Sequence, residues 1–105
     1  MTDFSPTTRA TDEARWLELT RHILPGLAHE RHWPISADHC FQRVLLDAAT
    51  GGVWYDAIAG RPAYRAATDA VLRHAVDLAE RVADGSVDLG ALNAQSLAWR
   101  RAQAA

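Results

Sequence analysis

The sequence of 105 residues lacks several features, and each absence narrows what the protein can be. It has one cysteine, which excludes a disulfide within the chain, so the fold does not depend on an oxidising compartment. Its apolar runs are all shorter than the ~18 residues that a membrane-spanning helix needs. The N-terminal stretch also lacks the apolar segment of a secretory signal. We therefore expect a cytoplasmic protein with no membrane contact.

Lysine is absent, and all 11 basic residues are arginine. A GC-rich genome explains this bias and also the many alanines; a need for planar, bidentate contacts to anions is the functional alternative. The formal net charge of −2 gives no overall attraction to nucleic acid, so we expect no nucleic-acid partner. The length predicts a single helical domain at residues 11–105, after a flexible lead-in at residues 1–10.

Apolar residues recur at the 3.6-residue spacing of a helix, and no stretch of useful length alternates as a strand does. The sequence therefore predicts an all-α fold, a compact bundle of about four main helices plus one or two short ones. The main helices are expected at about 11–24, 36–50, 68–84 and 88–101. The predicted N-caps are Thr11, Ser36, Thr68 and either Asp88 or Ser86, and the predicted stops are Gly51 and Gly85. Pro25-Gly26 is expected to stop or kink the first helix, and a short helical piece can continue from there to about Arg31.

Four tryptophans are hard to bury completely in so small a domain. Trp16 and Trp99 lie near the two ends of the predicted folded region, where each can anchor a contact between helices of two copies. We therefore predict a homodimer through the helices that carry these two residues.

Residues 32–64 combine titratable and aromatic side chains more densely than any other stretch. Within it, His39, Arg43 and Asp47 follow one another at four-residue intervals on one helix face, and Arg43 can pair with Asp47 at that spacing. If the aromatic segment 53–59 folds back over this helix, arginines and aromatic rings meet in a small cleft. Such a cleft suits a carboxylate or a phosphate. The predicted ligand-binding residues are Arg43, Trp54, Tyr55, Arg61 and Tyr64.

Three functional hypotheses and one structural alternative follow from this cluster. In the first, the cluster binds a small anionic molecule or a partner without chemistry. In the second, the protein is a small enzyme in which His39 or Asp47 acts as acid or base and Arg43 orients the substrate. In the third, the protein is a structural adaptor that acts through the surface around Trp99. The structural alternative is a buried polar network that defines the core. The sequence identifies no cofactor.

Two other sets of residues have recognisable chemistry. His29, His32 and His39, with Cys40 or Asp38, are residue types that bind zinc, although their spacing does not require a metal. Cys40 is expected in a first helical turn beside a histidine, a position that can activate a thiol, but lone cysteines more often serve as small buried apolar residues.

Four short segments, DHCFQRVLLD, GGVWYD, PAY and SLAWR, together resemble a family of short, largely uncharacterised helical proteins. The resemblance covers about residues 32–100. Some members of that family carry the name GCN5-related acetyltransferase. Acetyltransferases of that class have an α/β fold and a glycine-rich pyrophosphate loop. This sequence predicts neither, so the resemblance implies a helical fold and does not extend to the acetyltransferase activity.

Overall fold

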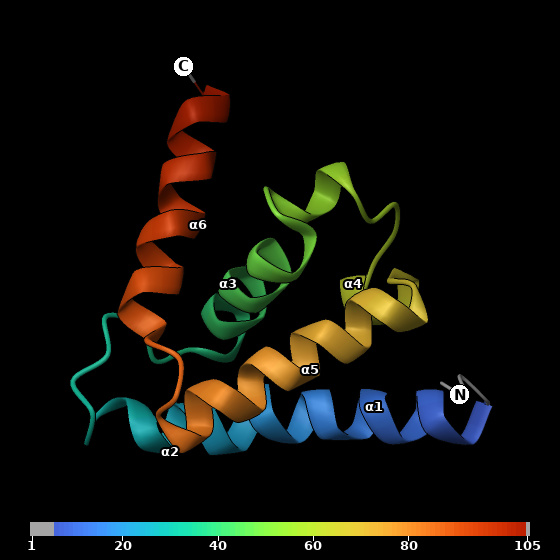
Figure 1. Cartoon of the computed structure of the whole chain (residues 1–105), viewed down its shortest axis with the longest axis horizontal. Coiled ribbons are helices and arrows are strands. Elements are labelled where there is room, and N and C mark those ends of the chain that lie inside the picture. The colour runs from blue at the N-terminus through green and yellow to red at the C-terminus, as the bar shows by residue number, and fades with distance from the viewer. Residues whose placement is uncertain (1–5, 105) are drawn as a thin grey trace.

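The computed structural model describes residues 6–104, and these residues form an all-α fold, as predicted (Figure 1). The four main helices are α1 (Pro6–Glu18), α3 (Asp38–Thr50), α5 (Asp69–Asp84) and α6 (Leu89–Ala104). Shorter elements connect them: a π-helix (Leu19–Ile23), α2 (Leu24–Ala28), the 3₁₀-helix η2 (Trp54–Asp56) and α4 (Ala63–Ala66). Each helix among residues 6–104 is too short or too polar to cross a membrane.

The first helix begins at Pro6, so the predicted start at Thr11 is wrong. Pro6 suits a first helical turn because its missing N–H has no partner there in any case. Arg9 then ties this part of α1 to the end of α4: its guanidinium donates to the carbonyl oxygens of Tyr64 and Ala67 at 2.9 and 2.8 Å. Residues 6–10 of the predicted lead-in are therefore helical and docked, and residues 1–5 lie outside the described part of the chain.

Of the two alternatives predicted at Pro25-Gly26, a stop is wrong, because the chain passes through both residues in helical geometry and the short helical piece expected after them is present as α2. Proline lacks an N–H, and its ring clashes with the carbonyl four residues earlier in a regular α-helix. The turn directly before Pro25 is a π-helix, in which the Leu24 N–H bonds to the Leu19 carbonyl oxygen. This wider turn accommodates the proline, and α2 follows without a break.

Local signals set the ends of the remaining main helices, with one exception. Thr68 caps α5 by accepting a hydrogen bond from the Val71 N–H, and Gly85 ends it with a φ of +89°. Gly51 ends α3 in the same left-handed conformation. At the start of α6, the Asp88 carboxylate accepts from the Gly90 N–H at 2.9 Å. These four predictions are confirmed.

The exception is the start of α3, where the predicted N-cap Ser36 is wrong. Ala37 occupies the N-cap position and offers no side-chain acceptor. The carboxylate of Asp38 replaces it, because its Oδ1 accepts from the His39 N–H at 2.7 Å. A side-chain oxygen thus still serves the helix N-terminus, from a residue two positions later.

The hydrophobic core lies where α1, α3 and α5 meet. In Figure 1, α1 and α5 run side by side, and α3 packs on α5 and on the π-helix that follows α1. The fully buried large side chains include Trp16, Leu19, Phe41, Leu45 and Leu72. Because Trp16 has no exposed surface, it cannot anchor a second copy, and this part of the dimer prediction is wrong. The helix that carries Trp16 extends back to Pro6, so Trp16 does not lie near an end of the folded region. Its side chain lies within the core.

Helix α6 packs mainly on α3 and extends away from the α1–α5 layer (Figure 1). Only Leu89, Asn93 and Ser96 of α6 are buried, and two of these three are polar. Trp99 is half-buried, and Leu97 is exposed. The contact between α3 and α6 therefore depends largely on polar side chains.

Candidate functional site

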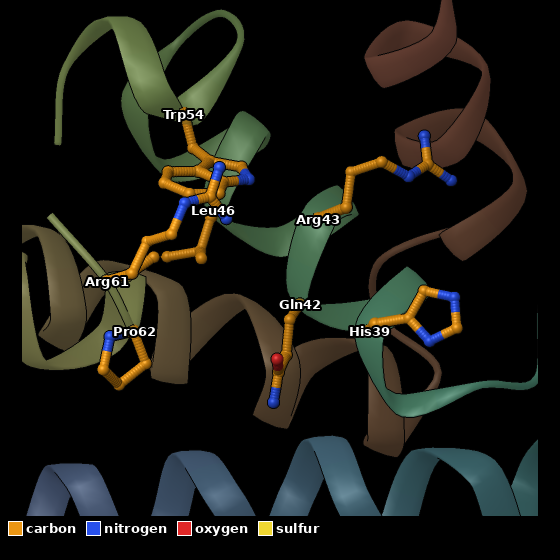
Figure 2. A pocket seen from close by; sticks show the side chains of 8 residues that line it. His39, Gln42, Arg43, Leu46, Trp54, Arg61 and Pro62 are labelled. Carbon is orange, nitrogen blue, oxygen red and sulfur yellow. The ribbon is translucent and has the colours of Figure 1, made fainter. Parts of the chain in front are cut away.

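A cavity of about 250 Å³ lies beside α3, between this helix and the segment that runs from η2 to α4. We call it the α3 cleft. It is lined by His39, Gln42, Arg43, Leu46, Trp54, Arg61, Pro62 and Ala63. Figure 2 shows α3 contributing one wall, with Trp54 and Arg61 meeting on the other side. Trp54 of the aromatic segment does lie over this side of α3, which is the condition on which the expected cleft depended.

Arg61 and Trp54 form the most distinctive pair in the cleft. The guanidinium carbon of Arg61 lies 5.1 Å from the centre of the Trp54 ring, within the range of a cation–π contact (Figure 2). Among residues 6–104, no carboxylate or carbonyl oxygen accepts a hydrogen bond from Arg61. The ring thus positions a cation whose N–H groups have no acceptor within the described protein.

Trp54 is itself positioned by Asp47, which is fully buried. The backbone N–H of Trp54 donates to Asp47 Oδ1 at 2.9 Å, and this hydrogen bond fixes the start of η2 against α3. Asp47 also accepts from the Ser96 hydroxyl at 2.6 Å and from Arg100 at 3.0 and 3.1 Å. The hydrogen bond to Asp47 raises the pKa of Arg100 above its usual range. Both oxygens of this carboxylate are therefore occupied by donors from the protein.

Arg43 points from α3 toward α6, away from Trp54 (Figure 2). Its Nη1 donates to the Ser96 hydroxyl at 2.9 Å, and its Nη2 donates to Asn93 Oδ1 at 2.8 Å. The predicted ion pair between Arg43 and Asp47 is therefore wrong. Both side chains turn instead to α6, where the Ser96 hydroxyl links them by accepting from one and donating to the other. We call Arg43, Asp47, Asn93, Ser96 and Arg100 the α3–α6 seam.

The floor of the cleft connects it to the π-helix. Leu46 is buried at the base, and Gln42 donates from Nε2 to the Thr20 hydroxyl oxygen at 3.1 Å. Thr20 in turn donates to the Trp16 carbonyl oxygen at 2.9 Å. The amide of Gln42 is thus oriented by the first helical segment, and its carbonyl oxygen has no hydrogen-bond donor among the described residues.

His39 lies at the open end of the cleft with an exposed side chain (80% exposed). Its Nδ1 is 3.6 Å from Asp38 Oδ1, which is within ion-pair range but beyond a hydrogen bond. Because Asp47 does not line the cleft, the two predicted catalytic residues do not face a common space. This arrangement does not favour acid–base chemistry by the pair.

Tyr55 and Tyr64 were predicted to bind ligand but do not line the cleft. Tyr55 is 47% exposed, and its hydroxyl donates to Gln103 Oε1 at 3.2 Å while Arg100 lies over its ring. Tyr64 packs partly on the core, and its hydroxyl accepts from Arg65 Nε at 3.3 Å. Of the five predicted binding residues, Arg43, Trp54 and Arg61 are brought together.

The sequence did not indicate Gln42, Leu46, Asn93, Ser96 or Arg100 as part of this region. Gln42 and Leu46 are one turn apart and flank Arg43 on α3, so the helix spacing was a usable signal for them. The α6 residues are about 50 positions away in sequence, and only the tertiary fold brings them to α3.

The candidate zinc ligands do not assemble. Among residues 6–104, no three side chains of histidine, cysteine, aspartate or glutamate converge in a way that could coordinate an ion. Cys40 is free and partly buried in the first turn of α3.

Comparison with known proteins assigns no family. The chain matches no protein-family model, no curated protein and no solved structure. The resemblance to short helical proteins through GGVWYD and SLAWR therefore stays a prediction, and a function has to be argued from the cleft itself.

Proposed function

We propose that the protein binds a small anionic molecule in the α3 cleft. The observation that carries this proposal is the charge of the lining: two arginines and no carboxylate. The nearest buried acid, Asp47, is outside the lining and is neutralised by Arg100. An anion in the cleft would therefore meet positive charge without facing a competing carboxylate.

Arg61 is the side chain best suited to make the contact. Its guanidinium has no acceptor among the described residues, and the Trp54 ring restricts its position. A restricted side chain loses less conformational entropy when a ligand arrives, so the same hydrogen bonds give a higher affinity. Arginine also offers parallel N–H groups that match the two oxygens of a carboxylate.

The geometry favours binding over catalysis. His39 is mostly exposed at the mouth, and the fully buried Asp47 accepts four hydrogen bonds. A general base needs a free lone pair within hydrogen-bond distance of the proton that it takes. Asp47 lacks that freedom, so its role in this proposal is to position Trp54 and α6.

The test is a titration of ¹⁵N-labelled protein with the sodium salts of phosphate, sulfate, acetate and benzoate at constant ionic strength, followed by NMR. At least one anion should cause saturable shifts in the Trp54 indole and in the backbone amides of residues 39–46, 61 and 63. Replacing Arg61 by glutamine should remove the saturation. If none of the four anions shifts these signals, the proposal is wrong.

A further inference from the structure

The size of the α3 cleft limits the kind of anion that it can accept. A water molecule occupies ~30 Å³ of the liquid, so the cavity of about 250 Å³ has room for about eight waters. Pockets for drug-sized ligands and cofactors span ~300–1,000 Å³. The cleft is therefore too small to enclose a nucleotide cofactor and matches a ligand with a single ring or a short chain.

The walls add a second restriction. Four of the eight lining residues, Leu46, Trp54, Pro62 and Ala63, present apolar surface. A small inorganic anion would leave these walls wet, whereas a ligand with an apolar body would remove their surface from water. The lining thus favours an organic anion that has an apolar part opposite its charge.

The available donors add a third restriction. Arg43 already donates from both terminal nitrogens to Ser96 and Asn93, so Arg61 is the lining guanidinium without an acceptor among residues 6–104. One guanidinium satisfies one carboxylate through two parallel hydrogen bonds. Phosphate sites usually add backbone N–H groups from a helix N-terminus. Here α4 is four residues long and follows Pro62, which has no N–H.

From these three restrictions we infer that the ligand of the α3 cleft is a small monocarboxylate with an apolar body. This inference rests on the anion-binding function proposed above. The carboxylate of the ligand pairs with the Arg61 guanidinium, and the apolar body of the ligand lies against Leu46, Pro62 and Ala63. Trp54 keeps the guanidinium in place from the other side.

The experiment compares four probes by the same NMR titration of the full chain: benzoate, benzamide, acetate and inorganic phosphate. Benzamide keeps the ring and removes the charge, acetate keeps the charge and removes the ring, and phosphate replaces the carboxylate. Benzoate should bind at least ten times more tightly than each of the other three, since each lacks one of the interactions described.

The variant Arg61→Gln should lower the affinity for benzoate by at least ten-fold. Arg65→Gln is the matched control. Arg65 lies 5.8 Å from the centre of the Tyr64 ring, in the same kind of stacking contact, but outside the cleft. Both arginines are exposed, so neither change removes a buried group. The Arg65 variant should bind benzoate as the unmodified protein does.

The outcomes separate the inference from the proposed function. If phosphate or acetate binds as tightly as benzoate, the monocarboxylate inference is overturned and anion binding stands. If benzamide binds as tightly as benzoate, or if no probe binds, both are overturned. Equal losses of benzoate affinity in the Arg61 and Arg65 variants would overturn the inference as well. The affinity would then depend on the net charge of the protein and not on the position of Arg61.

Discussion

Helix α3 is packed on its two sides by different means, and the contrast explains much of the molecule. Toward α5 and the π-helix it presents Phe41, Val44 and Leu45, all buried in the apolar core. Toward α6 it presents Arg43 and Asp47, which bond to polar side chains of the seam. Apolar packing is non-directional and scales with buried area. A polar seam is directional, and each member depends on the others.

This contrast between the two sides of α3 matters for the α3 cleft, because the seam positions the walls of the cleft. Asp47 fixes both the start of η2, through the Trp54 N–H, and α6, through Ser96 and Arg100. Arg43 belongs to the lining and to the seam at once. The core thus provides stability, while the seam determines the geometry of the candidate site. Two predictions test this division, a third concerns an exposed ion pair outside both regions, and the three follow in order of decreasing effect.

The largest effect is expected in the core. Phe41→Ala removes a fully buried ring from α3 and should reduce the free energy of unfolding by about 4 kcal/mol, as Phe-to-Ala changes in cores do. Urea denaturation followed by circular dichroism measures this loss. The loss should be the same at low and high salt, because no charge is involved. A strong dependence on salt would contradict the apolar description of this side.

The second largest loss of unfolding free energy is expected from a substitution in the seam. Asp47→Ala leaves Arg100, Ser96 and the Trp54 N–H without their acceptor and should cost about 3 kcal/mol. Asp77→Ala is the control, since Asp77 pairs with Arg81 on the exposed face of α5, and it should cost no more than ~0.5 kcal/mol.

Hydrogen exchange of the Asp47 variant sharpens the comparison. Amides of α6 should lose protection before those of α5, because the seam is the main attachment of α6. If α5 and α6 lose protection together, the seam and the core are one cooperative unit and the division proposed here is wrong.

The smallest effect concerns a surface pair between α1 and α5. Arg15 donates two hydrogen bonds to Glu80 at 2.7 and 2.8 Å, and this contact lowers the pKa of Glu80 from its ordinary value of 4.5, against the opposing effect of burial. A lowered folded-state pKa stabilises the folded protein above the ordinary pKa, and the contribution is lost as the pH falls through the folded-state value.

The variant Glu80→Gln tests this linkage. Both side chains are about two-fifths exposed, so solvent weakens the pair and the variant should lose less than about 1 kcal/mol at neutral pH. The difference in the free energy of unfolding between variant and unmodified protein should narrow as the pH falls below the ordinary pKa of 4.5. Urea denaturation at neutral pH and below pH 4.5 measures it. A difference that grows in acid would show that the pair does not act through the ionised carboxylate.

Local signals in the sequence were enough to predict most of the fold. The apolar spacing identified the faces that carry Leu72 and Leu45, and Thr68, Gly51 and Gly85 set helix ends through contacts within a few residues. The errors occurred where a distant contact or a backbone adjustment prevailed. Arg9 docks on α4 and extends α1 beyond the predicted start, and the π turn lets the helix continue through Pro25.

The candidate site was predictable only in part, for the same reason. Density of charged and aromatic residues pointed to Arg43, Trp54 and Arg61, which do line the cleft. The i,i+4 spacing of Arg43 and Asp47 suggested a pair, but α6 offers each of them better-placed partners. A spacing rule describes an isolated helix, and it cannot include acceptors and donors that a helix about 50 residues later supplies.

The π-helix of residues 19–23 has a consequence for how this chain can change by insertion and deletion. Loss of one residue there would replace the π turn by a regular α-helical turn, in which the Pro25 ring clashes, and would turn α1 by about 100° relative to α2. Trp16 would rotate out of the core, and Thr20 would leave Gln42. A one-residue gap in this turn is therefore far more damaging than its length suggests.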